Sequence, residues 1–203
     1  MLTFQHCLRV EDPRLREALW QLAELIFAPL CEQTPINQFY PRDTFEEFLL
    51  NEEVIKILEF SDGTLCGFGL ATENVDLEPI LTSRYFAKHF PGKQTFLVML
   101  VGVHPDYRRG EAGPEIYRQI GSYMHTDGIG LYLHSDDINP HIPRLMDIIY
   151  RKAMITERVD SEVCWLYHYE DKPRLLPERR REDLLQNGPL TLAFEGQRTP
   201  ATP

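Results

Sequence analysis

The pattern of apolar and polar positions divides the first 170 residues into alternating strands and helices. Short apolar or alternating runs predict strands over 2–10, 54–60, 65–75, 95–103 and 128–135, and one or two more over 155–170. Apolar residues that recur every three or four positions predict helices over 11–27, 41–51, 77–92 and 143–153, and one more that opens at Pro114. This order places one strand–helix–strand crossover in a sheet that begins with hairpins. We therefore predict an α/β fold with a mixed, mainly antiparallel central sheet and helices on both faces.

Local features support three of these elements. Asp12 is placed to cap the helix 11–27. The pair Asp62-Gly63 between two apolar runs is typical of a tight hairpin turn. Segment 95–103, TFLVMLVGV, is almost entirely apolar, which indicates a central strand covered on both faces.

Charge and cysteine content limit the functions of the chain. The net charge of −10 argues against general nucleic-acid binding, and a polyanionic ligand would need a local basic patch. The four cysteines form no CxxC pair and have no histidine at metal-ligand spacing, so we expect no metal site and a reducing compartment. No apolar stretch approaches the roughly 18 residues of a membrane span, and no secretion signal is visible. We expect a cytoplasmic protein with no membrane partner.

The turn 104–114, HPDYRRGEAGP, lies between the most apolar strand and a helix. A helix N-terminus offers unpaired N–H groups and a partial positive charge, and both favour bound phosphate. Arg108 and Arg109 add positive charge, and Gly110 and Gly113 let the backbone approach a ligand closely. The segment therefore indicates a phosphate cradle. The alternative is an ordinary strand-to-helix turn with exposed arginines.

This strand–turn–helix unit resembles the acyl-CoA-binding motif of the GNAT superfamily of N-acyltransferases. The family pattern is an apolar strand that ends in V-x-V-x-P, then a basic residue, a glycine-containing turn and a helix. The matching positions are Val101, Val103, Pro105, Arg108 and Gly113. The middle glycine of the pattern falls on Glu111, whose carboxylate would repel the CoA pyrophosphate unless its side chain points to solvent. The element order from Leu2 to about Glu170 also fits the family, with 77–92 as an enlarged segment.

The resemblance implies acetyl-CoA or another acyl-CoA as the acyl donor. The implied donor-binding residues are Val101, Val103, Arg108, Arg109, Gly110, Ala112, Gly113 and Asn139. By the same resemblance, the backbone at the end of the central strand holds the donor and polarises its carbonyl. Asn139 corresponds to an asparagine that often follows the next strand in the family.

The resemblance also implies a general acid, Tyr150, which lies in a degenerate copy, IYRKAMI, of the family's closing motif. Its alternative role is that of a half-buried core tyrosine. The central strand lacks the acidic residue that serves many relatives as a base. His104 and His134, each at a strand end, are the candidate bases because histidine accepts protons near neutral pH. A lone histidine at a strand end is also commonly structural.

Three functional hypotheses follow. The first is an N-acyltransferase, most simply an N-acetyltransferase, that acylates the primary amine of a small molecule or amino-acid-like acceptor. The second, motivated by Glu111 and the enlarged segment 77–92, is an acyltransferase whose donor is carried on a protein. The third is an inactive binding module, which would have a closed sheet in place of a gap between strands 95–103 and 129–134.

Several segments carry no recognisable motif for the chemistry. Acceptor specificity is expected in 30–50, 77–92 and 136–143. We expect residues 1–170 to form the acyltransferase domain and residues 171–203, rich in proline and arginine, to form an extension that packs on the domain or on a partner subunit. Through that extension the chain could form a homodimer.

Overall fold

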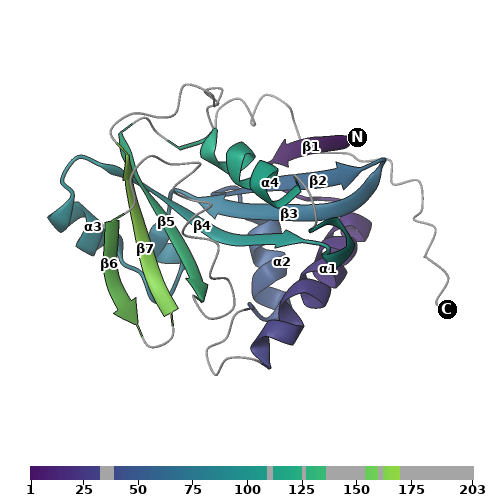
Figure 1. The fold of residues 1–203 in the computed structure, drawn as a ribbon, viewed down its shortest axis with the longest axis horizontal. Coiled ribbons are helices and arrows are strands. Elements are labelled where there is room, and N and C mark those ends of the chain that lie inside the picture. Colours follow the sequence, from purple (N-terminus) through teal and green to yellow (C-terminus); the bar gives the residue numbers. More distant parts are fainter. Residues whose placement is uncertain (33–38, 109–111, 125–126, 136–153, 160–161, 170–203) are drawn as a thin grey trace.

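The computed structural model of the 203-residue chain shows a sheet between two helical layers (Figure 1). It describes residues 1–32, 39–108, 112–124, 127–135, 154–159 and 162–169. The expected helix at 143–153 and the expected extension at 171–203 lie outside the described residues.

Seven strands form one sheet in the order β1-β2-β3-β4-β5-β7-β6. Their bounds are β1 Leu2–Cys7, β2 Val54–Ser61, β3 Thr64–Thr72, β4 Gln94–Val103, β5 Gly128–Ser135, β6 Met154–Val159 and β7 Glu162–Tyr169. Only β4 and β5 pair in parallel, and every other neighbouring pair is antiparallel. The prediction of a mixed, mainly antiparallel sheet is therefore confirmed, with segment 155–170 forming two strands.

Helices cover both faces of this sheet (Figure 1). Their bounds are α1 Pro13–Cys31, α2 Arg42–Leu50, α3 Ser83–His89 and α4 Ala112–Gly121, with short 3₁₀ helices η1 Val75–Leu77 and η2 Pro105–Tyr107. The apolar sides of α1 and α2 pack on one face of the sheet, and α4 packs on the other. α4 begins at Ala112, two residues before the predicted start at Pro114.

The sheet lets α4 approach closely because β3 carries glycine beneath the helix. A Cβ atom on Gly69 would lie 2.9 Å from Ile120 Cδ1, closer than real Cβ contacts come. Side chains at these positions would push the helix outward. The glycines of β3 therefore set the height of α4 above the sheet.

The predicted helix over 77–92 is wrong in its extent. The chain instead forms η1, then an extended Glu78, and only later the short helix α3. Pro79 explains the break, because the residue before a proline is disfavoured in helical conformation. The carboxylate of Asp76 then accepts hydrogen bonds from the backbone and the hydroxyl of Ser83, which joins η1 to the start of α3.

The predicted hairpin between β2 and β3 is confirmed. Asp62 and Gly63 both have positive φ angles, 48° and 81°. This is the conformation that a two-residue hairpin turn with an Asp-Gly sequence adopts. The turn aligns Phe60 with Leu65, and a register shift between Glu59 and Phe60 then places Glu59 of β2 opposite Gly67 of β3.

Candidate functional site

The sheet opens between its two parallel strands. The β4–β5 ladder runs from the pair Gln94 and Gly128 to the pair Val98 and Tyr132. β4 then continues to Val103 and β5 to residue 135, and the described residues of the two strands make no further pairs with each other. Figure 1 shows the two strands diverging there. The described parts of β4 and β5 are therefore paired only over their first five residues.

A bulge in β4 marks the point of divergence. Leu100 pairs with Leu70 and Val98 with Ala71, so Met99 is an extra residue on β4. Met99 and Leu100 both join the core beneath α1, whereas Val98 packs in the core beneath α4. A bulge bends its strand, and this one occurs where β4 leaves β5. Beyond it, β4 keeps β3 as its partner and turns its other backbone edge toward the gap.

The turn after β4 is anchored to the end of the sheet. The His104 backbone N–H donates to the Cys66 carbonyl over 2.8 Å, and the His104 ring accepts a hydrogen bond from the Asp106 N–H over 3.2 Å. Arg108 is exposed, and its Nε donates to the Val103 carbonyl over 3.1 Å. These bonds hold a guanidinium at the surface between the end of β4 and the start of α4.

The start of α4 has room beside Gly113. Among the described residues, nothing lies within 4 Å of a Cβ atom built on Gly113. The first N–H groups of a helix have no partner within it and carry partial positive charge. Open space at Gly113 and an exposed guanidinium at Arg108 fit the phosphate groups of a CoA donor.

Glu59 is a buried carboxylate beside this turn that the sequence did not single out. It lies on β2 opposite Gly67 and has no exposed surface. Neither carboxylate oxygen has a hydrogen-bond partner among the described residues. A Cβ atom on Gly67 would lie 2.5 Å from Glu59 Oε2 and 2.8 Å from Ile116 Cδ1. The carboxylate is therefore packed under the first turns of α4.

The surroundings of Glu59 disfavour its charge. Burial, and then the negative charge of Glu115 in the first turn of α4, raise the pKa of Glu59 to about 7. The Glu115 carboxylate itself accepts from Arg118 over 2.9 Å and from Gln119 over 2.7 Å. The strand alternation contained a clue, because Glu59 follows Ile55 and Ile57 on one face of an apolar strand.

A second buried polar contact joins two of the segments expected to set acceptor specificity. Tyr40, next to α2, donates its hydroxyl to the carboxylate of the buried Glu78, between η1 and α3. Burial, and then the Glu78 charge, raise the pKa of Tyr40. The Tyr40 ring also packs edge-on against Phe48. Segments 30–50 and 77–92 therefore meet at this contact.

The structure brings part of the predicted site together. Val101 and Val103 lie on β4 beyond the bulge, followed by Arg108 and Gly113. His104 follows β4 directly, and its ring is turned onto its own turn. The backbone of His134 lies on β5 past the last β4 pair, opposite Val163 of β7. The predicted site residues outside the described residues are Arg109, Gly110, Asn139 and Tyr150, together with Glu111.

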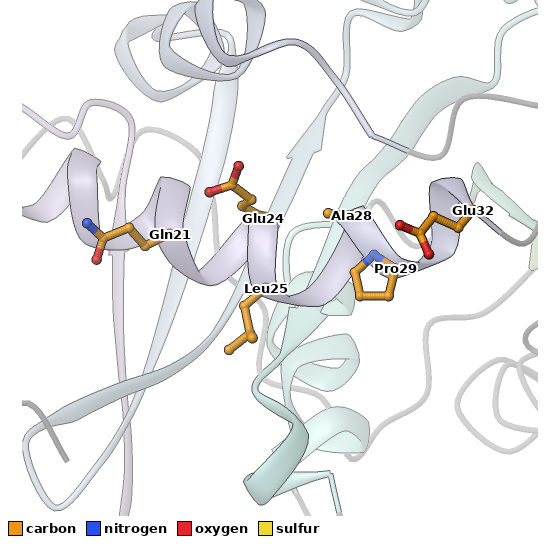
Figure 2. A pocket seen from close by; sticks show the side chains of 6 residues that line it. All are labelled: Gln21, Glu24, Leu25, Ala28, Pro29 and Glu32. Atoms are coloured by element: carbon orange, nitrogen blue, oxygen red, sulfur yellow. The ribbon is translucent and has the colours of Figure 1, made fainter. Parts of the chain in front are cut away.

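A shallow depression lies elsewhere, on the outer face of α1 (Figure 2). Its lining residues are Gln21, Glu24, Leu25, Ala28, Pro29 and Glu32. Because α1 and α4 cover opposite faces of the sheet, this depression is not the phosphate turn. The described residues hold no cluster of three or more potential metal ligands, and none of their helices is long and apolar enough to cross a bilayer.

No protein-family model and no curated protein sequence matches the chain. Solved structures do match its fold. The N-acetyltransferase of ribosomal protein S18 alanine from Escherichia coli is 10% identical, with a TM-score of 0.55 over 87% of this chain and 99% of that one. The chain has the GNAT acetyltransferase fold. FeeM, an N-acyl amino acid synthase from uncultured soil microbes, is 10% identical, with a TM-score of 0.60 over 83% of this chain and 91% of that one.

A third enzyme of similar fold was solved with its substrate and coenzyme A bound. Diaminobutyrate acetyltransferase from Paenibacillus lautus, in complex with L-2,4-diaminobutyric acid and coenzyme A, is 11% identical. It has a TM-score of 0.55, with 85% of this chain and 98% of that one covered. At these identities the likeness concerns the fold alone. The donor and the acceptor must therefore be argued from the residues of this chain.

Proposed function

We propose that this protein is an N-acyltransferase that moves an acyl group from an acyl-CoA to a primary amine of a small molecule or amino-acid-like acceptor. The observation that carries the proposal is the parting of β4 and β5 beyond Val98 and Tyr132, next to the turn that presents Arg108 and the start of α4. An open strand edge can hold the amides of a pantetheine arm, and the turn can hold its phosphates. The third hypothesis, an inactive module, predicted a closed sheet, and the early end of the ladder speaks against it.

The chemistry needs a donor, an oriented carbonyl and two proton transfers. In the proposed site, the β4 backbone from Val101 to Val103 orients the thioester and polarises its carbonyl. His104 and His134 are proposed to accept the amine proton, directly or through water, and Tyr150 to protonate the departing thiolate. Glu59 lies too far from the β4 backbone to accept the proton of the amine. It lies on β2, two strands and so about 10 Å from β4.

The acceptor class is proposed from two observations. The similar folds include enzymes named for an alanine, a diaminobutyrate and an amino acid as acceptors, each of which carries an amino group. In this chain the Tyr40–Glu78 contact ties together two segments proposed to shape the acceptor pocket. We therefore propose an amine with an amino-acid-like framework.

Calorimetry with acetyl-CoA and with longer acyl-CoAs tests the donor assignment. We expect binding of at least one, and we expect release of free thiol when a suitable amine is added. Arg108→Ala should weaken binding, whereas Arg14→Ala, an exposed arginine on α1 and so on the other face of the sheet, should not. Absence of binding by every acyl-CoA would remove the donor assignment.

A carrier-protein donor is the second candidate. The observation that favours it is the acidic character of the turn, where Glu59 and Glu115 lie close to the proposed phosphate site. A phosphopantetheine arm on a carrier has one phosphate and no adenosine, so it meets less repulsion there. Parallel assays with an acyl-CoA and with the same acyl group on a carrier protein decide between them. Full transfer from acyl-CoA without the carrier would argue against this candidate.

A further inference from the structure

Glu59 is a buried carboxyl group that has no partner among the described residues. Its side chain has no exposed surface, and neither oxygen has a hydrogen-bond partner in the described part of the chain. An isolated ionised carboxylate is costly in such surroundings, and the group avoids this cost by keeping its proton. The protein therefore holds a proton that can be lost or gained near neutral pH.

Among the described residues, no positively charged group stabilises an ionised Glu59. From α4, Glu115 acts on it with a negative charge. From β3, the Cys66 thiol donates to the Glu59 backbone carbonyl over 3.5 Å, and burial, then the Glu59 charge, raise the pKa of that thiol. From β1, the register partner is the uncharged Phe4. Arg118 is bound to Glu115.

Glu59 also lies at the end of the sheet that leads into the turn. Its partner Gly67 is itself paired with Val103, the last residue of β4. Its Oε2 and Ile116 Cδ1 share the space above Gly67, so the carboxylate lies under the start of α4. A phosphate bound at that helix start and an ionised Glu59 would repel each other across a poorly hydrated layer.

We propose that an acyl-CoA donor binds this turn with Glu59 protonated, so that donor binding takes up a proton. This inference rests on the proposed donor site. Bound pyrophosphate makes ionisation of Glu59 still less favourable, so the proton is retained to higher pH in the complex than in the free protein. At pH values above about 7, the free protein loses the proton and the donor must restore it.

The consequence is a directional pH effect on donor affinity. At pH values below the pKa of Glu59, the dissociation constant of the donor does not depend on pH. At pH values above it, the dissociation constant rises by up to about tenfold per pH unit. The neutral amide introduced by Glu59→Gln would resemble the protonated carboxyl group, so this variant should bind the donor with an affinity that stays flat across the same range. Glu115→Gln removes the neighbouring negative charge, so the pKa of Glu59 should fall and the rise should begin at a lower pH.

Calorimetry between pH 6 and 9 tests the inference on the full chain. Dephospho-CoA, which keeps the pyrophosphate but lacks the 3′-phosphate, is titrated in two buffers with different ionisation enthalpies, so that proton uptake is counted directly. We expect uptake that approaches one proton above pH 7 in the natural protein and none in Glu59→Gln. His104→Gln, which removes the imidazole of the turn, should retain the uptake.

Each outcome has a distinct meaning. No binding at any pH overturns the donor site and this inference together. Binding without proton uptake, or with affinity independent of pH, overturns the inference and leaves the donor site intact. If Glu59→Gln does not fold, proton uptake by the natural protein and the direction of the Glu115→Gln shift decide the matter. An unchanged pH profile in Glu115→Gln counts against Glu59 as the titrating group.

Discussion

The carboxylate of Glu59 occupies the space that a side chain at position 67 would need. A Cβ atom on Gly67 would lie 2.5 Å from Glu59 Oε2 and 3.2 Å from the Gly102 carbonyl oxygen. We therefore expect Gly67→Ala to lower the free energy of unfolding by about 1–3 kcal/mol, the usual range for overpacking a core. Chemical denaturation measures the change. Gly113→Ala is the matched control, because its added Cβ meets nothing within 4 Å and its stability should not fall. Equal stability of both variants would contradict the packing described here.

Glu59 should also make the free energy of unfolding depend on pH. Its pKa is about 7 in the folded state against an ordinary value of 4.5, so the folded protein keeps a proton that the unfolded chain has lost between these pH values. Stability therefore falls as pH rises through this window, by up to about 3 kcal/mol, and is level above it. Glu59→Gln should lack this fall, and so exceed the natural protein in stability at pH 8 but not at pH 4.5.

Denaturant titrations at pH 4.5, 6, 7 and 8 check this prediction. Glu24→Gln, at an exposed position on α1, serves as the control and should follow the natural protein at every pH. If the free energy of unfolding of Glu59→Gln falls with rising pH as much as that of the natural protein, the fall comes from other groups.

Lys56 is a buried cation that joins three backbone segments. Its Nζ donates to the carbonyls of Leu8 and Asn51, each over 2.6 Å, and to that of Val54 over 2.9 Å. Lys56→Met would keep most of the side-chain volume but leave buried carbonyls without this donor. We expect a loss of about 3–5 kcal/mol in the free energy of unfolding. Lys88→Met, at an exposed position on α3, should change it little, and a similar small effect of Lys56→Met would be against this role.

Two substitutions in the turn after β4 should change the affinity for CoA in opposite directions. Arg108→Ala removes an exposed guanidinium beside the start of α4, so CoA should bind about tenfold more weakly. Glu111→Gly removes a carboxylate from the position where the family pattern has glycine, so CoA should bind more tightly. Calorimetry with CoA at constant ionic strength measures both. If neither variant changes the affinity, the pyrophosphate binds elsewhere.

Elements with a strong local pattern were predictable from the sequence. The strand 95–103 and the Asp62-Gly63 hairpin depend on residues that lie next to one another, and both are present. The helix expected over 77–92 is divided because Pro79 acts locally against a pattern that otherwise favours helix. The assignment of Arg108 and Gly113 to a donor site comes from the resemblance to a family motif and stays a prediction.

Features that depend on distant partners were not predictable in this way. Lys56 and Glu59 interrupt an apolar strand, and their burial follows from carbonyls and a helix contributed by other parts of the chain. The bulge at Met99 appears only in the register between β3 and β4. No local pattern in TFLVMLVGV marks the residue at which β4 leaves β5.

The extra residue at Met99 divides β4 into two sections that have different strand partners. Residues 94–98 pair with β5, and the last two of them also pair with β3, whereas residues 100–103 pair with β3 alone and lead into the turn. Deleting Met99 would restore regular alternation, with Val101 and Val103 still on the α4 side, and would remove the bend at which β4 leaves β5. For protein engineering, the segment from Leu100 through the turn is thus a natural unit of exchange: it can be replaced as one piece, provided that the insertion before it is kept.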